Sequence, residues 1–202
     1  MAHLPLNKSS LKQERNRLAT YARFLPSLDL KRRQLMWELR RAERELAEIE
    51  ADISRLAESA QDLFALVGSV DMKLAGLVRV RQVDLTEENV VGVRLPRIAA
   101  VDVEVAEYST LAKPFWLDAL ADKLRAMLEL RARRGVGGER VRRLEQAVQK
   151  VTQRVNLFEK VLIPQARENI SRIQIHLADA ERAAVVRSKI MKANRRQRPA
   201  VA

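Results

Sequence analysis

A heptad pattern of apolar residues in the first third of the chain constrains the fold more than any other feature. Alternating steps of three and four residues from Leu11 to Val67 visit seventeen positions, of which fifteen are apolar and only Glu14 and Arg32 are charged. A helix with this spacing pairs lengthwise with a second helix in a left-handed coiled coil. As one helix, residues 11 to 67 would span roughly 85 Å, which is too long for a single globular core.

Local signals mark the course of this first helix. Ser9 or Ser10 can cap its start, and its end is expected near Gly68–Asp71. Pro26 lies inside the pattern. We expect a kink at this proline and not a helix end, because the pattern resumes beyond it.

A second heptad pattern, from Val141 to Leu162, predicts the partner helix. Pro164 follows it directly, and the pattern then continues in shifted phase through Ala166 and Ile170. Successive steps of four residues amount to a stutter, which locally unwinds a left-handed supercoil, and a proline disrupts a helix interior. We therefore expect a bend at Pro164. The seam residues that we predict are Leu35, Leu39, Leu46, Ile49, Ile53, Leu56, Val148, Val151, Val155, Phe158 and Leu162.

The middle of the chain has a period of two. From Val101 to Val105, valine alternates with an acidic residue, which is typical of a strand with one exposed face. We predict a short β-hairpin in which the stretch from Val91 to Leu95 pairs with this strand across Pro96 and Arg97. Two strands alone are marginally stable, so another element must cover one face.

The predicted fold class is mainly α: a long antiparallel two-helix coiled coil of N- and C-terminal helices, with a small insert containing the hairpin. Residues 1–69 form the N-terminal coiled-coil helix, and residues 70–115 form a distal insert with its hairpin at about 90–106. Residues 116–195 form the C-terminal coiled-coil helix, and 196–202 a disordered basic tail. The GVGG stretch at Gly135–Gly138 is expected to interrupt the second helix as a loop, hinge or strained turn.

The composition argues against several kinds of site. The chain has no cysteine, which excludes disulfides, thiolate catalysis and cysteine metal sites. His176 and Asp179 lie one helical turn apart, but the sequence offers no third metal ligand beside them, and His3 is near the terminus. The glycine stretch lacks the Gly-Lys-Ser/Thr ending of a phosphate-binding loop. We predict no enzymatic activity, no cofactor, no metal and no small-molecule substrate.

Charge is concentrated at the C-terminal end. The chain has 38 basic and 26 acidic residues, for a net charge of +12. After Glu181 there is no acidic residue. A basic surface of this kind is solvated, docks on an acidic protein, or binds nucleic acid, and we favour the first two because the last 30 residues have no aromatic side chain. The basic residues of this end are Arg182, Arg187, Lys189, Lys192, Arg195, Arg196 and Arg198.

The block that begins VTQRVNLFEKVLIP resembles the D subunit family of V-type and archaeal-type rotary ATPases. The family pattern T-x-R-R-V-N-A-L-E-x-V-x-I-P is followed, after a gap, by R-x-K-x-x-K. The matching residues are Thr152, Arg154, Val155, Asn156, Glu159, Val161, Ile163 and Pro164, and then Arg187, Lys189 and Lys192. The stretch from Asn7 to Leu35 is similar to the family's opening, with departures at Pro26, Ser27 and Gln34, and VVGVRLPRI resembles a third family segment.

The resemblance implies a non-catalytic central stalk. In this family, the paired terminal helices enter the A₃B₃ catalytic hexamer, which is built from the A and B subunits. The other end binds the F subunit and the component that links the stalk to the membrane ring. Arg187, Lys189 and Lys192 would then face the inner surface of the hexamer, and a bend at Pro164 would make the shaft eccentric.

The same resemblance implies a location. The complex would lie on the cytoplasmic side of the cell membrane, with no direct membrane insertion of this chain and no nucleic acid bound. The alternatives are a basic coiled-coil protein that binds nucleic acid, or a coiled-coil scaffold.

Overall fold

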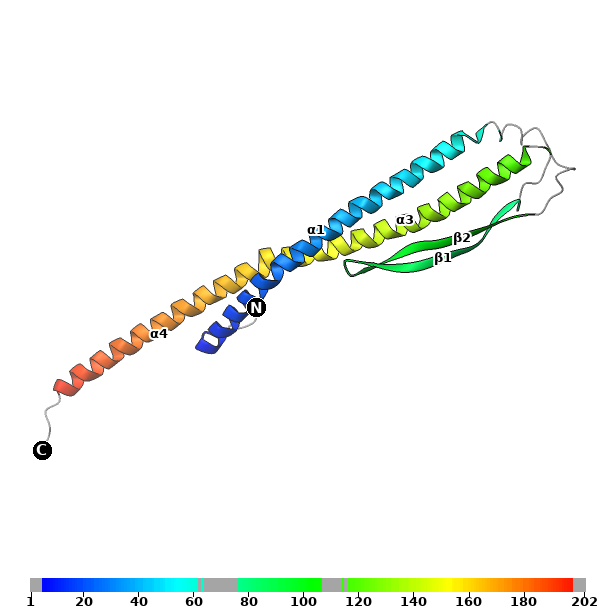
Figure 1. Cartoon of the computed structure of the whole chain (residues 1–202). Helices are drawn as coiled ribbons and strands as arrows, with labels where there is room; N and C mark the ends of the chain where they lie inside the picture. The colour runs from blue at the N-terminus through cyan, green and yellow to red at the C-terminus, as the bar shows by residue number, and fades with distance from the viewer. Residues whose placement is uncertain (1–4, 62, 64–75, 107–113, 115, 198–202) are drawn as a thin grey trace. The chain divides into compact units, whose positions relative to one another are not determined.

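The computed structural model describes residues 5–61, 63, 76–106, 114 and 116–197 (Figure 1). Two compact units are present: the terminal unit, Met1–Leu30 with Val151–Ala202, and the central unit, Lys31–Lys150. The predicted fold class is confirmed, since long helices at both ends of the chain flank a two-stranded antiparallel hairpin. The elements are α1 (Lys8–Glu58), β1 (Val78–Val90), β2 (Val93–Val105), α3 (Leu117–Leu157), the π-helix η1 (Phe158–Leu162) and α4 (Ile163–Gln197).

Helix α1 begins at Lys8, before both of the predicted caps, Ser9 and Ser10. The side chain of Asn7 accepts a hydrogen bond from the backbone N–H of Ser10 at 2.8 Å, so Asn7 and not a serine caps the helix. The helix passes through Pro26 without ending, as predicted. It ends at Glu58, before the expected end near Gly68, and the expected end itself lies outside the described residues.

A turn at Ser59 and Ala60 follows α1. The Ser59 hydroxyl donates to the Leu56 carbonyl at 2.9 Å and accepts from Lys123 Nζ at 2.7 Å. Ser27 and Ser54 bond their own backbone in the same way and stay helical, so the contact with Lys123 of α3 distinguishes Ser59.

The expected interruption of the second helix at Gly135–Gly138 is wrong. Helix α3 continues through this stretch in the central unit. A Cβ added to Gly137 would lie 3.3 Å from Leu46 Cδ1 and 4.0 Å from Ile49 Cδ1, whereas Gly135 and Gly138 face open space. The missing side chain of Gly137 lets α1 approach α3, so tertiary packing offsets the low helix propensity of glycine.

These glycines give a first testable prediction. Gly138→Ala is expected to raise the free energy of unfolding by about 0.5–1 kcal/mol, because it removes a helix-interior glycine without a steric conflict. Gly137→Ala is expected to gain less, since Leu46 would have to shift. Urea unfolding followed by circular dichroism measures both variants. An equal gain from the two substitutions would contradict the close approach of α1 and α3.

The hairpin differs from the predicted one in its first strand and its turn. Val101–Val105 does form a strand, but it belongs to β2 together with Pro96 and Arg97, and its partner is the start of β1. The connection lies at Val91 and Gly92, which both have positive φ (52° and 81°). A two-residue hairpin turn of this kind suits the strand twist, but valine rarely adopts it. The sequence therefore lacks the Asn-Gly or Asp-Gly pair that usually marks such a turn.

Two register shifts adjust the hairpin. They fall between Val80 and Gln82 and between Asp84 and Leu85, and each leaves one residue outside the pairing, as in a β-bulge. One face of the hairpin is covered, as predicted, since Leu95 and Val103 are buried. At the open end, Val78 packs against a buried cluster that joins Leu77 to the first turns of α3. The members of this cluster are Leu77, Trp116, Leu117, Leu120 and Ala121.

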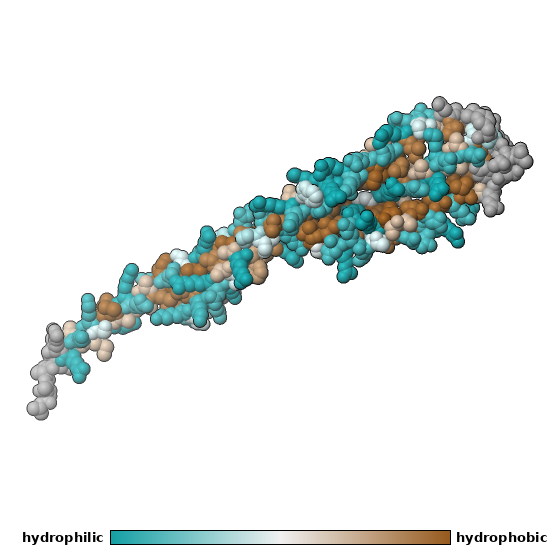
Figure 2. Space-filling model, in the orientation of Figure 1, coloured by the Kyte–Doolittle hydropathy of each residue, from teal (hydrophilic) through white to brown (hydrophobic). Residues whose placement is uncertain are grey.

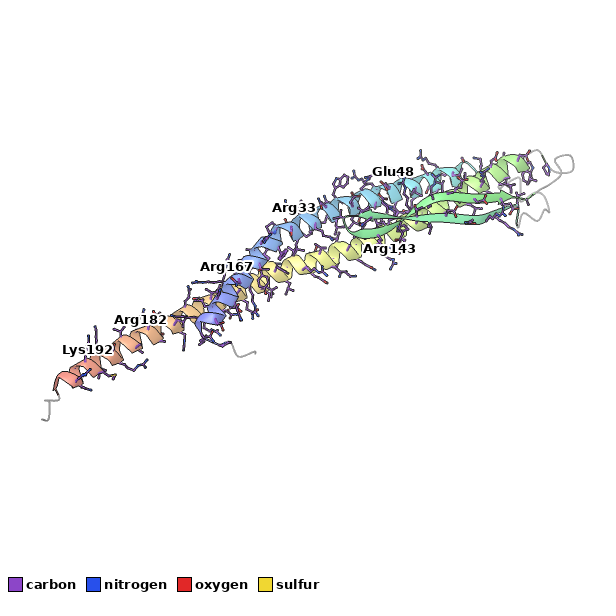
Figure 3. The ribbon with its side chains drawn as sticks, turned by 60° about the horizontal axis from the view of Figure 1, so that its bottom comes forward. Arg33, Glu48, Arg143, Arg167, Arg182 and Lys192 are labelled. Carbon is purple, nitrogen blue, oxygen red and sulfur yellow. The ribbon has the colours of Figure 1, made fainter. Side chains whose placement is uncertain are left out.

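In the central unit, α1 and α3 run antiparallel, and hydrophobic side chains gather between them (Figure 2). Glu50 of α1 pairs with Arg134 of α3 at 3.0 Å. Ser59, which follows Glu50 in the chain, contacts Lys123, which precedes Arg134 in α3. β1 and β2 lie alongside α3 (Figures 1 and 3). The hairpin is thus the third layer over a two-helix pair.

Candidate functional site

The family-like motif from Thr152 to Pro164 lies in the terminal unit, at the end of α3, in η1 and at the start of α4. Val155 is 2% exposed, and Thr152, Asn156 and Ile163 are half-buried. Arg154, Glu159 and Pro164 are exposed. These side chains are spread along one helical path and do not converge on a point, so the motif is not a catalytic centre of the usual kind.

The helix is irregular at this motif. Residues Phe158–Leu162 form a π-helix, in which the N–H of Ile163 donates to the carbonyl of Phe158, five residues earlier. A π-turn inserts one residue into an α-helix and rotates everything beyond it. Pro164, which has no N–H to donate, follows immediately. The shifted phase predicted from the stutter is therefore accommodated by a π-turn just before the proline.

Burial follows the shifted pattern in the terminal unit. Val151 and Val155 are buried before the π-helix, and Ala166 and Ile173 are buried after it. Between them, Phe158 is half-buried and meets Tyr21 of α1 edge to face, with ring centroids 5.3 Å apart. Among the predicted seam residues elsewhere, Leu35 is fully buried, and those that are half-buried are Leu39, Leu46, Ile49, Ile53, Leu56, Val148 and Leu162.

A charged residue occupies one seam position. Glu14 is 4% exposed, and its carboxylate accepts hydrogen bonds from Arg17 at 2.6 Å and from Asn169 Nδ2 at 3.4 Å. A buried carboxylate is costly unless its oxygens are paired. The contact with Asn169 therefore favours one alignment of α1 against α4, because a displaced helix would leave this carboxylate without that partner.

The end of α4, in the terminal unit, is exposed as far as the structure describes it. Every residue from Asp179 to Arg195 is exposed, including Arg187, Lys189 and Lys192. Figure 3 shows Arg182 and Lys192 on this stretch, with side chains around the ribbon. Helix α4 extends to Gln197, so residues 196 and 197, which we predicted to be in the disordered tail, are helical, and residues 198–202 are outside the described part.

Two arginines of α3, which the sequence pattern did not single out, hold the hairpin in the central unit. Arg140 donates to the Pro96 carbonyl at 3.0 Å and pairs with Glu88 at 3.3 Å. Arg143 donates to the Arg94 carbonyl at 3.1 Å and to Glu139 at 2.7 Å. The sequence only weakly indicated that these arginines contact the hairpin, because a row of arginines on a helix is usually a solvated face.

Glu139 pairs with Arg142 and Arg143 of the same helix, and we call these three residues the arginine group. Hydrogen bonds from Arg142 and then from Arg143 lower the pKa of Glu139 from 4.5 to about 2. A carboxyl group whose pKa is lower in the folded chain stabilises the fold above its unfolded pKa, and this contribution is lost on acidification. The relevant pH window therefore runs from about 4.5 down to about 2.

We expect Glu139→Gln to remove that part of the acid sensitivity. The parent chain should lose stability between pH 4.5 and 2 more steeply than the variant, as measured by urea midpoints at several pH values. Glu145→Gln is the control, since Glu145 is exposed on the same helix and has no ion-pair partner among the described residues. Parallel curves for the parent chain and Glu139→Gln would contradict the role of the arginine group.

No metal or membrane-spanning feature is found in the described part of the chain. It contains no group of three or more histidine, cysteine or acidic side chains placed to hold a metal. His176 and Asp179 are both exposed on α4, and His3 lies outside the described residues. Within the same ranges, no helix has the length and apolar composition to cross a bilayer.

Paired long helices, an inserted hairpin and an uncovered helix end define a mainly helical protein that lacks a convergent catalytic centre within its described residues. The chain belongs to the family of ATP synthase D subunits, whose model matches residues 10–193. The V-type ATP synthase D subunit of Borreliella burgdorferi is 30% identical over 194 residues, which is 96% of each chain. The protein of the same name from Chlamydia abortus is 32% identical over 202 residues, covering 98% of this chain and 96% of its own length.

Proposed function

We propose that this chain is the central stalk shaft of a V-type or archaeal-type rotary ATPase and transmits torque between the A₃B₃ catalytic hexamer and the ion-translocating membrane ring. The family membership supports a place in such a complex. In this role the chain performs no chemistry of its own. It converts nucleotide-driven changes in the hexamer into rotation, or the reverse.

The observation that carries the proposal is the uncovered end of α4. Val185 and Met191 are 54% and 72% exposed, and Val186 and Ile190 are similarly open. Large apolar side chains that stay exposed together on one stretch of helix indicate a site of protein contact. The basic residues among them favour an acidic protein surface as the partner, because nucleic acid would leave the apolar side chains exposed.

The distribution around α4 indicates the shape of that partner. At roughly 100° per residue, Val186 lies about 100° and Met191 about 240° around the helix from Val185. A helix that packs on one neighbour has its apolar residues in one stripe. Apolar residues on several sides suit a partner that surrounds the helix, such as the inner surface of a hexamer.

The remaining parts of the proposal follow from the family. The F subunit would dock along the paired helices near the insert, and the component that links the stalk to the membrane ring would bind the end away from the termini. The complex would be peripheral, on the cytoplasmic side of the membrane. In the terminal unit, the π-helix and Pro164 would make the shaft eccentric, so that three equivalent catalytic sites meet different faces. A nucleic-acid-binding or general scaffold protein would leave the match over residues 10–193 unexplained.

A cysteine crosslink tests rotation directly, because the chain has no cysteine of its own. Met191→Cys, loaded with a cleavable photo-crosslinker in the reconstituted complex, should join the catalytic hexamer and stop multiple-turnover ATP hydrolysis. Cleavage of the linker should restore hydrolysis. The parent chain under the same treatment is the control. Undiminished hydrolysis after complete crosslinking would disprove rotation of this helix within the hexamer.

A further inference from the structure

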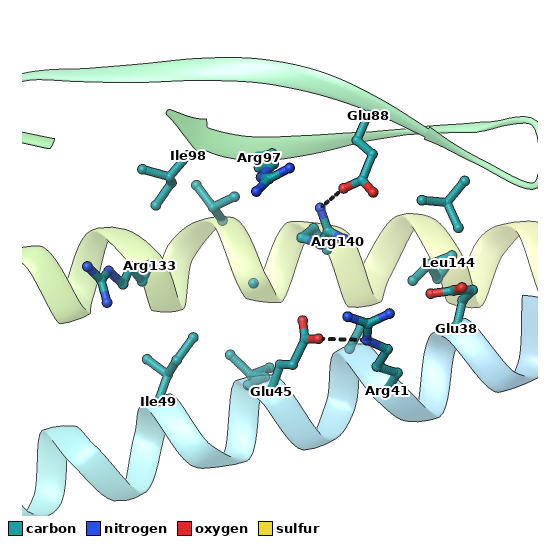
Figure 4. A pocket seen from close by; sticks show the side chains of 15 residues that line it. Glu38, Arg41, Glu45, Ile49, Glu88, Arg97, Ile98, Arg133, Arg140 and Leu144 are labelled. Carbon is teal, nitrogen blue, oxygen red and sulfur yellow. Dashed lines mark hydrogen bonds and ion pairs between the residues drawn. The ribbon is translucent and has the colours of Figure 1, made fainter. Parts of the chain in front are cut away.

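A cavity of about 420 Å³ lies inside the central unit, between α1, α3 and the hairpin (Figure 4). Apolar and charged residues of all three elements line it. This volume is within the roughly 300–1,000 Å³ range of small-molecule sites. The apolar lining includes Leu46, Ile49, Ile98, Val136 and Leu144.

The packing of α3 explains why the space is not filled. Gly137 has no side chain to project into it. On the hairpin side, the long side chain of Arg140 spans the distance from α3 to the Pro96 carbonyl and to Glu88. The hairpin is therefore held at the length of an arginine from the helix pair, and apolar side chains beneath it stay partly uncovered.

The charges of the lining are unevenly placed. Four of the charged side chains form two ion pairs, Arg41 with Glu45 at 3.0 Å and Arg140 with Glu88. Arg97 of β2 and Arg133 of α3 also line the cavity, and neither has a carboxylate partner among the described residues. The cavity thus has two guanidinium groups, from two different elements, whose charge is not balanced by an ion pair.

The remaining carboxylate of the lining is at the opposite end. Because α1 and α3 are antiparallel, Glu38 lies toward Leu144, whereas Arg133 lies toward Ile49 (Figure 4). Glu38 and Ile49 are eleven residues apart, or roughly 16 Å along α1. Arg133 therefore lies near one end of the cavity and Glu38 near the other, whereas Arg97 lies between them, close to Glu88 and Arg140 (Figure 4).

We propose that this cavity binds a small amphipathic anion, whose carboxylate or phosphate group lies between Arg97 and Arg133 and whose apolar part covers Leu46, Ile49 and Val136. Guanidinium groups bind such oxyanions through paired N–H donors. The bound molecule would also connect β2 to α3 next to the contact made by Arg140. This inference does not depend on the proposed rotor function, and its test needs only the full chain.

Isothermal titration of the full chain with decyl phosphate and decanoate, below their micelle concentrations, tests the site. Each should bind with a stoichiometry of one, at least tenfold more tightly than decanol, inorganic phosphate or decyltrimethylammonium. Equal binding of inorganic phosphate would show a free-phosphate site and overturn the amphipathic assignment. Equal binding of the cationic amphiphile, or no saturable binding of either anion, would overturn the proposal entirely.

Variants of the lining locate the site. The double variant Arg97→Gln/Arg133→Gln should weaken decyl phosphate binding at least tenfold. Arg131→Gln is the matched control, since Arg131 is exposed on the same helix but does not line this cavity, and should change affinity less than twofold. Val136→Phe, which fills part of the cavity, should abolish binding. Circular dichroism confirms folding, and Arg97→Gln alone, at an exposed position of β2, replaces the double variant if that variant unfolds. Equal weakening by Arg131→Gln would overturn the assignment.

Discussion

Val155→Asp is expected to destabilise the terminal unit by at least about 3 kcal/mol. Val155 is 2% exposed on the buried face of α3, and a carboxylate placed there loses its hydration without gaining a partner. Domain stabilities are only about 5–15 kcal/mol, so most of the margin would be lost. Thermal and urea unfolding followed by far-ultraviolet circular dichroism measure the effect.

The matched control is Val185→Asp, the same substitution at a position of α4 that is 54% exposed. Valine and aspartate have similar helix propensities, so the difference between the two variants isolates burial. The control should change the free energy of unfolding by less than about 0.5 kcal/mol. The loss of unfolding free energy in Phe158→Asp should lie between those of the two valine variants, because Phe158 is half-buried against Tyr21. Tolerance of Val155→Asp would show that the seam of the terminal unit is wrongly assigned.

The double variant Val186→Asp/Ile190→Asp should have the opposite profile: an unchanged melting curve, but severe loss of binding to the catalytic hexamer. Both side chains are exposed in the free chain, so aspartates there remain hydrated and cost little stability. If a partner covers these positions, each substitution forfeits about 1.5–3 kcal/mol of apolar burial. The summed loss corresponds to more than a hundredfold in affinity. Titration of the chain into the purified hexamer measures it.

Neutralising the basic residues of the same helix end separates charge from apolar contact. Arg187→Gln/Lys192→Gln should weaken binding less than tenfold, since exposed ion pairs contribute about 0–1 kcal/mol each. Weak, replaceable contacts suit a shaft that meets each catalytic site in turn. If the glutamine variant loses more affinity than the aspartate variant, charge and not apolar burial holds the end of α4.

The mainly helical architecture could be read from the chain because its cause is local and repeated. The three-four spacing around Leu35 and Val155 recurs over many turns, and both residues are buried. The strand at Val101–Val105 was readable for the same reason, as its alternation is local. The stutter after Leu162 likewise predicted an irregularity, which takes the form of the π-helix at Phe158–Leu162.

The sequence by itself determined which stretches are helical and which faces they bury, because apolar periodicity fixes both within a few turns. Only the tertiary structure decided the hairpin turn, where pairing of β1 with β2 holds Val91 at a φ that valine avoids in isolation. The same is true of Gly135–Gly138, which α1 keeps helical through Leu46. The cavity under the hairpin depends on Arg140 reaching Pro96, a contact between residues 44 positions apart. Such contacts produce no periodic pattern in the sequence, because their free energy comes from partners that only the folded chain brings together.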